Sequence, residues 1–183
     1  MTAVFSPEAI SFEPCELRDI PAITAIYAKA VRFGTASFEL EPPTEAEMAA
    51  RREALVAAGY PYLVARLQGE VAGYAYAGAY RARPAYRGTV ESSVYVRDDA
   101  QGRGVGSGLL AGLIHEAEIR GFRQMVAVIG DSANLTSRRL HEKLGFELVG
   151  ILKAVGWRHQ RWLDTVLMQR AIGPGDTIAG ERR

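Results

Sequence analysis

The sequence predicts a single domain of the mixed α/β (α+β) class. Its 183 residues are about the length of one domain. Strand patterns come first and then alternate with helix patterns, which is typical of helices packed on a sheet. The sequence contains no internal repeat and no clear interdomain linker. We therefore expect one hydrophobic core.

The first 60 residues predict one strand and two helices. Residues 11–17 are expected to form a short strand, and Asp19 is a suitable N-cap for the helix that follows. The apolar residues of that helix recur at helical spacing: Ile20, Ile23, Ile26, Tyr27 and Val31. A second helix begins at a capping box formed by Thr44 and Glu47, and Gly59 ends it.

The middle of the chain predicts three strands. Residues 62–67 and 71–80 flank a short turn and are expected to pair antiparallel. A basic loop, residues 81–88, leads to a strand at 89–96, whose residues alternate between two faces. One face carries Val90, Ser92, Val94 and Val96, and the other carries Glu91, Ser93 and Tyr95.

The last 80 residues predict helices and strands in alternation. A glycine-rich turn opens a helix that Gly121 ends, and residues 124–129 form a short apolar strand. The next helix, 134–144, is closed by Gly145. Two final strands follow at 147–153 and 162–170, and the glycine- and charge-rich tail is expected to be disordered.

Composition narrows the function classes. No apolar stretch is long enough for a membrane span and no secretory signal is evident, so we expect a cytoplasmic protein without a membrane partner. One cysteine and three scattered histidines predict no metal site. The net charge of +1 does not indicate a nucleic-acid partner. Residues 71–183, however, carry a net charge of +5, which favours an anionic ligand; the alternative is that charges on solvated faces happen to cluster there.

The glycine-rich turn is the strongest chemical signal in the sequence. It runs Gln101, Gly102, Arg103, Gly104, Val105, Gly106, Ser107. Glycines let backbone N–H groups approach a ligand, and the start of the following helix adds unpaired N–H groups, so the turn suits a phosphate or diphosphate. The alternative is a flexible turn without a ligand. No P-loop motif is present.

Several motifs together resemble the GCN5-related N-acetyltransferase (GNAT) family. Residues 101–106, with the pattern Gln-x-x-Gly-x-Gly, are similar to the acetyl-CoA pyrophosphate loop of that family. Residues 134–146, in which an Asn opens a helix that ends in Gly-Phe, resemble its second motif. Residues 89–96, 126–130 and 140–142 are similar to the phosphinothricin and methionine sulfoximine acetyltransferase branch.

This resemblance covers residues 11–171 and implies a GNAT-like domain, with flexible tails at 1–10 and 172–183. The implied fold is a twisted, mostly antiparallel mixed sheet with a splayed parallel strand pair and flanking helices. The resemblance also implies acetyl-CoA as co-substrate and a homodimer. Val94, Tyr95 and Val96 would pair with the pantetheine arm, residues 102–107 would hold the diphosphate, and Asn134 would contact the arm or simply cap its helix.

Two residues are the candidates for proton transfer. Acetyl transfer requires a base, because the acceptor amine must lose a proton before it attacks the thioester. Glu91 resembles the base of this branch, although an isolated Glu in a strand usually faces solvent. His141 occupies the place at which many GNAT enzymes carry a tyrosine acid. An imidazole can donate or accept a proton near neutral pH, or His141 has only a packing role.

The acceptor site is assigned to a third set of residues. Guanidinium groups bind carboxylate or phosphinate, so the basic loop suits the acidic end of an amino-acid-like substrate. The expected substrate residues are Phe38, Arg81, Arg83, Tyr86, Ser93 and Tyr95, each of which also fits ordinary surface or core placement. We therefore expect an N-acetyltransferase for a small amino-acid analogue such as phosphinothricin, methionine sulfoximine or methionine sulfone. The alternatives are another amine, a protein N-terminus, or a non-catalytic acyl-CoA sensor.

Overall fold

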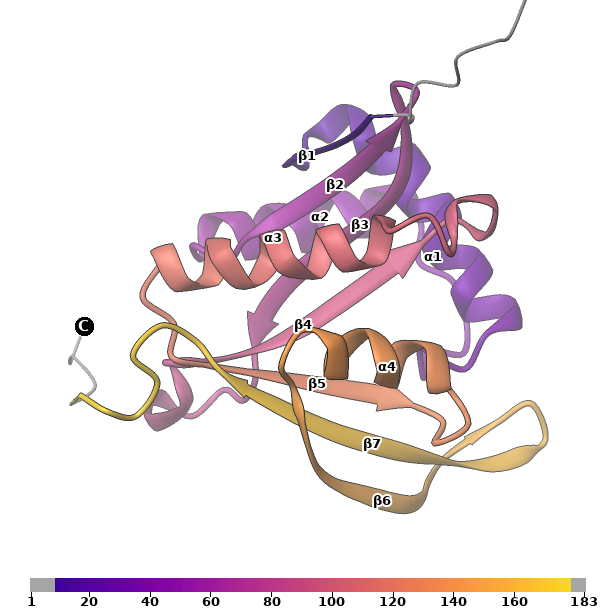
Figure 1. The fold of residues 1–183 in the computed structure, drawn as a ribbon. Helices are drawn as coiled ribbons and strands as arrows, with labels where there is room; N and C mark the ends of the chain where they lie inside the picture. The colour runs from indigo at the N-terminus through magenta and orange to yellow at the C-terminus, as the bar shows by residue number, and fades with distance from the viewer. Residues whose placement is uncertain (1–8, 179–183) are drawn as a thin grey trace, which may run out of the picture.

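A seven-stranded sheet forms the centre of the molecule (Figure 1). The structure is a computed structural model, and it describes residues 9–178. The strands are β1 (Ile10–Pro14), β2 (Tyr62–Leu67), β3 (Glu70–Ala79), β4 (Thr89–Val96), β5 (Gln124–Gly130), β6 (Glu147–Arg158) and β7 (Arg161–Ala171). Their order is β1-β2-β3-β4-β5-β7-β6, and β4 with β5 is the one parallel pair in the described residues.

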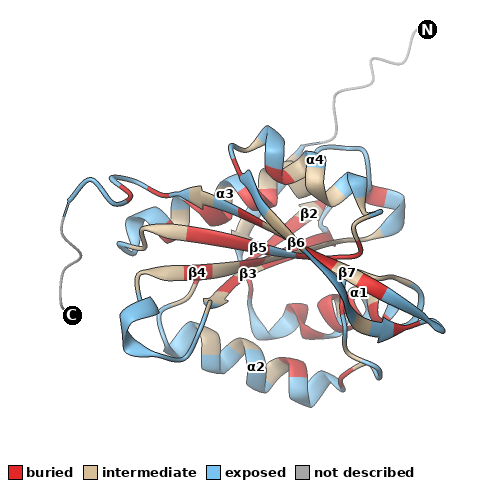
Figure 2. Cartoon of the chain, turned by 90° about the horizontal axis from the view of Figure 1, so that it is seen from below, coloured by how far each residue is buried: buried red, intermediate tan, exposed pale blue. Residues whose placement is uncertain are grey.

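Four α-helices cover the two faces of this sheet. They are α1 (Ile20–Phe33), α2 (Glu45–Ala57), α3 (Val105–Ile119) and α4 (Leu135–Lys143). Figure 2 shows α3 and α4 on one face and α1 and α2 on the other. Because both faces are covered, β2 is buried along almost its whole length. The expected class, a mixed and mostly antiparallel sheet with flanking helices, is confirmed.

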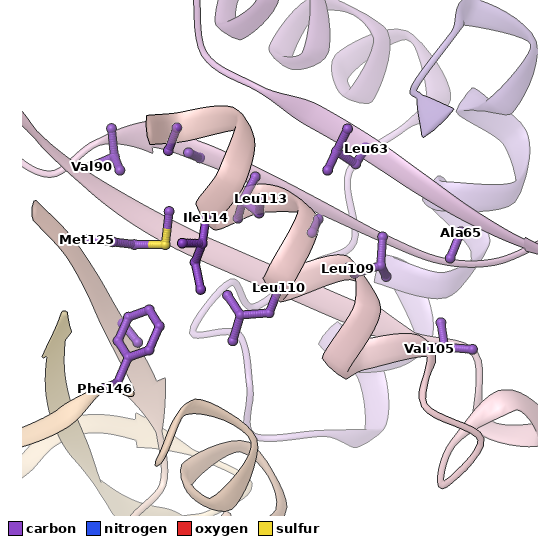
Figure 3. Packing of buried hydrophobic residues seen from close by; sticks show 14 of the residues in the cluster. Leu63, Ala65, Val90, Val105, Leu109, Leu110, Leu113, Ile114, Met125 and Phe146 are labelled. Atoms are coloured by element: carbon purple, nitrogen blue, oxygen red, sulfur yellow. The ribbon is translucent and has the colours of Figure 1, made fainter. Parts of the chain in front are cut away.

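The larger core lies between α3 and the sheet (Figure 3). Leu109, Leu110 and Leu113 of α3 are fully buried and face the strands. Alternate residues of β2 supply opposite faces: Leu63 packs in this core, whereas Tyr62 packs in the second core under α1 and α2. The strand alternation predicted from the sequence therefore sets the two-layer arrangement.

Local signals explain where several helices begin and end. Thr44 accepts a hydrogen bond from the backbone N–H of Glu47, and the Glu47 carboxylate accepts from the N–H of Thr44, so the expected capping box opens α2. Gly59 follows α2 with a φ of 83°, a conformation that favours glycine. Asp19 precedes α1 but makes no side-chain cap. Its carboxylate instead accepts from Glu16 N–H and pairs with Arg66.

The ends of the chain differ from the sequence expectation. β1 covers residues 10–14 rather than 11–17, because Leu17 already belongs to a short 3-10 turn. β6 extends to Arg158, past the expected end at 153, because the chain continues into a hairpin with β7. Ile172 was expected in the flexible tail, yet its side chain is 1% exposed in the main core. Residues 1–8 and 179–183 of the expected tails lie outside the described residues.

Candidate active site

β4 and β5 separate part-way along their length, as expected for a splayed parallel pair. Their pairing begins at Thr89 with Gln124 and ends at Ser92 with Ala127. Beyond that point, residues 93–96 of β4 and 128–130 of β5 line a shared cavity of about 1300 Å³. The edge of β4 that faces β5 has no strand partner there among the described residues, so its backbone groups are available to a ligand.

The glycine-rich turn forms one side of this cavity. Gly102 and Gly104 have φ values of 73° and 89°, and a Cβ built on either would meet no atom within 4 Å. Both residues line the cavity. The first bond of α3 runs from Gly108 N–H to Gly104 O, so the N–H groups of residues 105–107 precede it and are not used within the helix. This open cradle of N–H groups fits a diphosphate.

The expected cofactor residues gather here, except that Arg103 and Val105 do not line the cavity. The cavity is lined by Val94, Tyr95, Val96, Gln101, Gly102, Gly104, Gly106, Ser107 and Asn134. Val105 is 1% exposed and its side chain packs in the core, so only its backbone faces the cradle. A Cβ on Gly106 would lie 3.5 Å from the side chains of Leu140 and Val96, which brings α4 against the start of α3.

Asn134, which precedes α4, and His141, within α4, were both predicted to act at the site, and both line the cavity. Asn134 is the N-cap of α4, and its side-chain oxygen accepts from Ser137 N–H at 3.1 Å. His141 is buried, and its Nδ1 lies 2.8 Å from the Ser137 carbonyl oxygen. A carbonyl only accepts, so Nδ1 carries the hydrogen. Burial lowers the pKa of His141, which leaves Nε2 a neutral acceptor without a partner among the described residues.

Five cationic side chains line the cavity, and three of them are held in ion pairs. The pairs are Lys29 with Asp98 (2.5 Å), Arg97 with Asp99 (2.6 Å) and Arg161 with Asp131 (2.5 Å). Arg139 and Lys143 on α4 have no ion-pair or hydrogen-bond partner within residues 9–178. None of the five was predicted from the sequence as a site residue; the surplus of positive charge in residues 71–183 includes four of them, and Lys29 lies outside that range.

Comparison with known proteins decides the family. Residues 23–146 match the family described as Acetyltransferase (GNAT) family. This chain belongs to the GNAT family. A phosphinothricin N-acetyltransferase from Alcaligenes faecalis is 54% identical over 163 residues, 89% of this chain and 83% of that protein. An L-methionine sulfoximine/L-methionine sulfone acetyltransferase from Pseudomonas aeruginosa is 44% identical over 165 residues, 90% and 95% of the two chains.

A solved structure agrees with this assignment. A GNAT phosphinothricin acetyltransferase from Sinorhizobium meliloti, crystallised with acetyl-CoA, superposes with a TM-score of 0.91 at 46% identity, covering 94% of this chain and 93% of the other. The predicted recognition, fold and acyltransferase class are thereby confirmed. In the described part of this GNAT chain, no cluster of three metal-binding side chains occurs. No helix there is long and apolar enough to cross a membrane.

Glu91, the candidate base, sits one residue before the strands separate. It faces Gly78 on β3 and Val126 on β5, and its side chain is half-buried. Burial raises the pKa of its carboxyl above the ordinary value. It lies on the α1/α2 side of β4 with Ser93, whose hydroxyl is hydrogen-bonded to Tyr76. Glu91 does not line the cavity itself, but Ser92 and Ser93 beside it do.

The other expected acceptor residues are less closely gathered. Tyr95 lines the cavity and packs edge-on against Tyr27, with ring centres 5.0 Å apart. Arg81, Arg83 and Tyr86 lie in an exposed loop that does not contribute to the cavity lining. The loop is ordered locally, with Tyr86 packed edge-on against Tyr80 and the Arg81 guanidinium over the Tyr80 ring.

A connector between α1 and α2 carries the remaining candidate, Phe38. The Phe38 ring occupies the space above Gly130 and Gly156, where an added Cβ would lie 3.0 and 2.2 Å from ring atoms. Arg158, at the end of β6, is buried and donates to the carbonyl oxygens of Ser37 (2.8 Å), Glu39 and Val31. Sequence reasoning missed Arg158, because its partners lie more than 100 residues away and no local pattern marks them.

Proposed function

We propose that this GNAT enzyme transfers the acetyl group of acetyl-CoA to the α-amine of a small amino-acid analogue of the phosphinothricin, methionine sulfoximine or methionine sulfone type. The observation that carries the proposal is the pair of relatives named for these substrates, which match 89 and 90% of this chain. The cavity between β4 and β5, with its diphosphate cradle, supports the use of acetyl-CoA.

Acetyl-CoA would be held by backbone groups more than by side chains. The N–H groups of the turn at 102–107, which includes Arg103, suit the diphosphate, and Gln101 precedes the turn. The free edge of β4 at Val94–Val96 suits the amide groups of the pantetheine arm, which would add to the sheet like a strand. Asn134, which caps α4 with its oxygen, also lines the cavity beside the arm.

The reaction moves the acetyl group from sulfur to nitrogen, so that an amide bond replaces the thioester bond. The amine nitrogen loses a proton and bonds to the thioester carbonyl carbon, the carbon–sulfur bond breaks, and the sulfur takes a proton. Glu91 is the proposed base, directly or through a water molecule. Its raised pKa makes it a stronger proton acceptor than an exposed carboxylate.

His141 is proposed to act second in the proton path. In the resting state Nε2 accepts and does not donate, because Nδ1 holds the hydrogen. An α-ammonium group loses two protons on becoming an amide, so Glu91 can accept one and His141 the other. His141 can therefore protonate the leaving sulfur only after it has taken up this second proton. In this order of steps, a proton relay through His141 takes the place of the tyrosine that acts as the acid in many GNAT enzymes.

The acceptor's acidic group is proposed to bind Arg81 and Arg83, with Tyr86 and Phe38 forming walls of its site. Both guanidinium groups are exposed and so available to a carboxylate or phosphinate. Ser93 and Tyr95 come from β4 beside the candidate base. We include no metal in the proposal, so treatment with EDTA is expected to leave turnover unchanged.

A homodimer in the cytoplasm is part of the same proposal. β6 is an edge strand with several exposed apolar side chains: Leu148, Val149, Leu152, Val155 and Trp157. An exposed apolar edge strand is suited to burial against a partner. Light scattering after size exclusion should give about twice the mass of 19.9 kDa.

The test of the function is release of free CoA thiol from acetyl-CoA across a panel of amines. Phosphinothricin, methionine sulfoximine and methionine sulfone should be turned over with far higher kcat/KM than polyamines or peptides with a free N-terminus. If only peptides reacted, the substrate class would be wrong. If CoA bound tightly and no amine reacted, the chain would be a sensor and the proposal would fail.

A further inference from the structure

Gly78, in β3, has no structural reason to be a glycine. Its φ is not positive, and the register of β3 with β4 is unbroken from Gly73 to Ala79. The other glycines of the described strands are explained by their surroundings. A Cβ on Gly73, Gly130 or Gly156 would lie 2.8, 2.2 or 2.2 Å from its nearest neighbour, and Gly150 lies at a register shift of β6. A glycine inside a regular strand lowers stability and often marks a place where a ligand comes close.

The space over Gly78 is open and lies beside the proposed base. Outside its own segment, a Cβ on Gly78 would have one neighbour within 4 Å, Leu55 Cδ2 of α2 at 3.5 Å, which is an ordinary van der Waals contact. Gly78 pairs directly with Glu91 across the two strands, so both positions belong to the same face of the sheet. Directly opposed side chains lie about 4.5–5.5 Å apart. An amine held by Glu91 therefore has its substituents within reach of this space.

The neighbours of Gly78 along β3 border the proposed acceptor site. Tyr76, two residues earlier, shares the face of Gly78 and is hydrogen-bonded to Ser93. Tyr80, two residues later, carries the Arg81 guanidinium over its ring at 5.1 Å. The missing side chain thus lies between the proposed base and the residue proposed to bind the acidic group of the acceptor.

We propose that the space over Gly78, bounded by Leu55, receives the side chain of the acceptor and limits its length. The inference rests on the proposed function. With the amine at Glu91 and the acidic group at Arg81, the side chain of the acceptor has to pass the position at which β3 has none. Leu55 supplies an apolar wall, which suits a terminal methyl group such as the one on phosphorus or sulfur in the proposed acceptors.

Two variants change the size of this space in opposite directions. Gly78→Ala adds one methyl group in contact with Leu55, and Leu55→Ala removes the atoms of the wall. One methylene group in an apolar site changes kcat/KM by about 10- to 200-fold. Gly78→Ala should therefore lower kcat/KM for methionine sulfone and for phosphinothricin at least about 10-fold. Leu55→Ala should raise the ratio of kcat/KM for ethionine sulfone, which is one methylene longer, to that for methionine sulfone about 10-fold. KM for acetyl-CoA should stay unchanged in both variants.

Gly150→Ala is the matched control. It makes the same change in a strand, with no atom within 4 Å of the added Cβ, and β4, β5 and β7 lie between its strand and β3. This variant should keep the wild-type kcat/KM for each acceptor. Urea unfolding checks the fold of Gly78→Ala, which should unfold at a higher urea concentration than wild type, because alanine loses less conformational entropy on folding.

The outcomes separate this inference from the proposed function. Wild-type kcat/KM for the acceptors in Gly78→Ala would overturn the inference alone, as would an equal rise in KM for acetyl-CoA and for the amine. A Leu55→Ala enzyme with the wild-type ratio for the two sulfones would also overturn it. Failure of wild type to acetylate methionine sulfone, methionine sulfoximine and phosphinothricin would overturn the proposed function and the inference with it.

Discussion

Glu91, the proposed base, has a half-buried carboxylate. Glu91→Gln keeps the shape of the side chain and removes its proton-accepting capacity. We expect kcat to fall by about 10²- to 10⁴-fold, the usual contribution of a positioned base, while the dissociation constant for acetyl-CoA stays near that of wild type. Residual activity should rise with pH as free amine accumulates. Glu53→Gln, at an exposed position on α2, is the control. Wild-type turnover in Glu91→Gln would remove the base assignment.

The buried imidazole of His141 predicts a pH dependence of stability. Its pKa is lowered by burial, so the folded state resists protonation more than the unfolded state does. Stability is therefore fully present above the ordinary pKa of about 6.5 and declines as pH falls towards the lower pKa of the folded state. Urea titrations should show a smaller decline between pH 7 and 5 in His141→Gln than in wild type. Equal declines would contradict the assignment.

The glycine-rich turn allows a matched test at the level of an element. Gly104 and Gly59 both have positive φ, 89° and 83°, and both have open space where a Cβ would lie. Valine at either position costs similar backbone strain, about 1–2 kcal/mol, but only Gly104 borders the cavity. Gly104→Val should raise KM for acetyl-CoA at least about 10-fold and leave KM for the amine little changed. Gly59→Val should change neither constant.

Hydrogen bonds from Arg158, at the end of β6, hold the connector between α1 and α2 in place. Arg158→Lys replaces a fork that reaches three carbonyl groups with a single ammonium. Unsatisfied buried carbonyls should lower the free energy of unfolding by about 1–3 kcal/mol. Because the connector carries Phe38, KM for the amine should rise more than KM for acetyl-CoA. Arg18→Lys, at an exposed ion pair, is the control. Equal changes in the two KM values would show that the connector is not part of the acceptor site.

Local signals predicted the elements better than they predicted the contacts between them. The capping box at Thr44, the alternation of β4 and the glycine-rich turn each depend on neighbours in sequence, and each was found in the expected place. The Arg158 clamp and the packing of Phe38 over Gly156 depend on residues brought together only by the finished sheet.

At the scale of the whole molecule, substitution of Ile172 tests where the folded domain ends. Its side chain fills part of the main core, and its N–H donates to the carbonyl of Arg123 at 2.8 Å. Ile172→Ala should lower the free energy of unfolding by about 2–5 kcal/mol. Ile178→Ala, a change of the same chemistry at a 56% exposed side chain, should have little effect. Urea unfolding of both variants measures the difference. Equal effects would place Ile172 in the tail after all.

Trp157 and Trp162, the two tryptophans of the chain, face each other across the β6–β7 hairpin with ring centres 5.3 Å apart. Both are more than half exposed. All tryptophan fluorescence therefore comes from one solvent-exposed end of the molecule. This end lies beside the β6–β7 turn, which contacts the connector between α1 and α2. Emission should be strongly quenched by iodide in the monomer, and the proposed homodimer, which covers β6, should shift the emission to the blue and shield it from iodide.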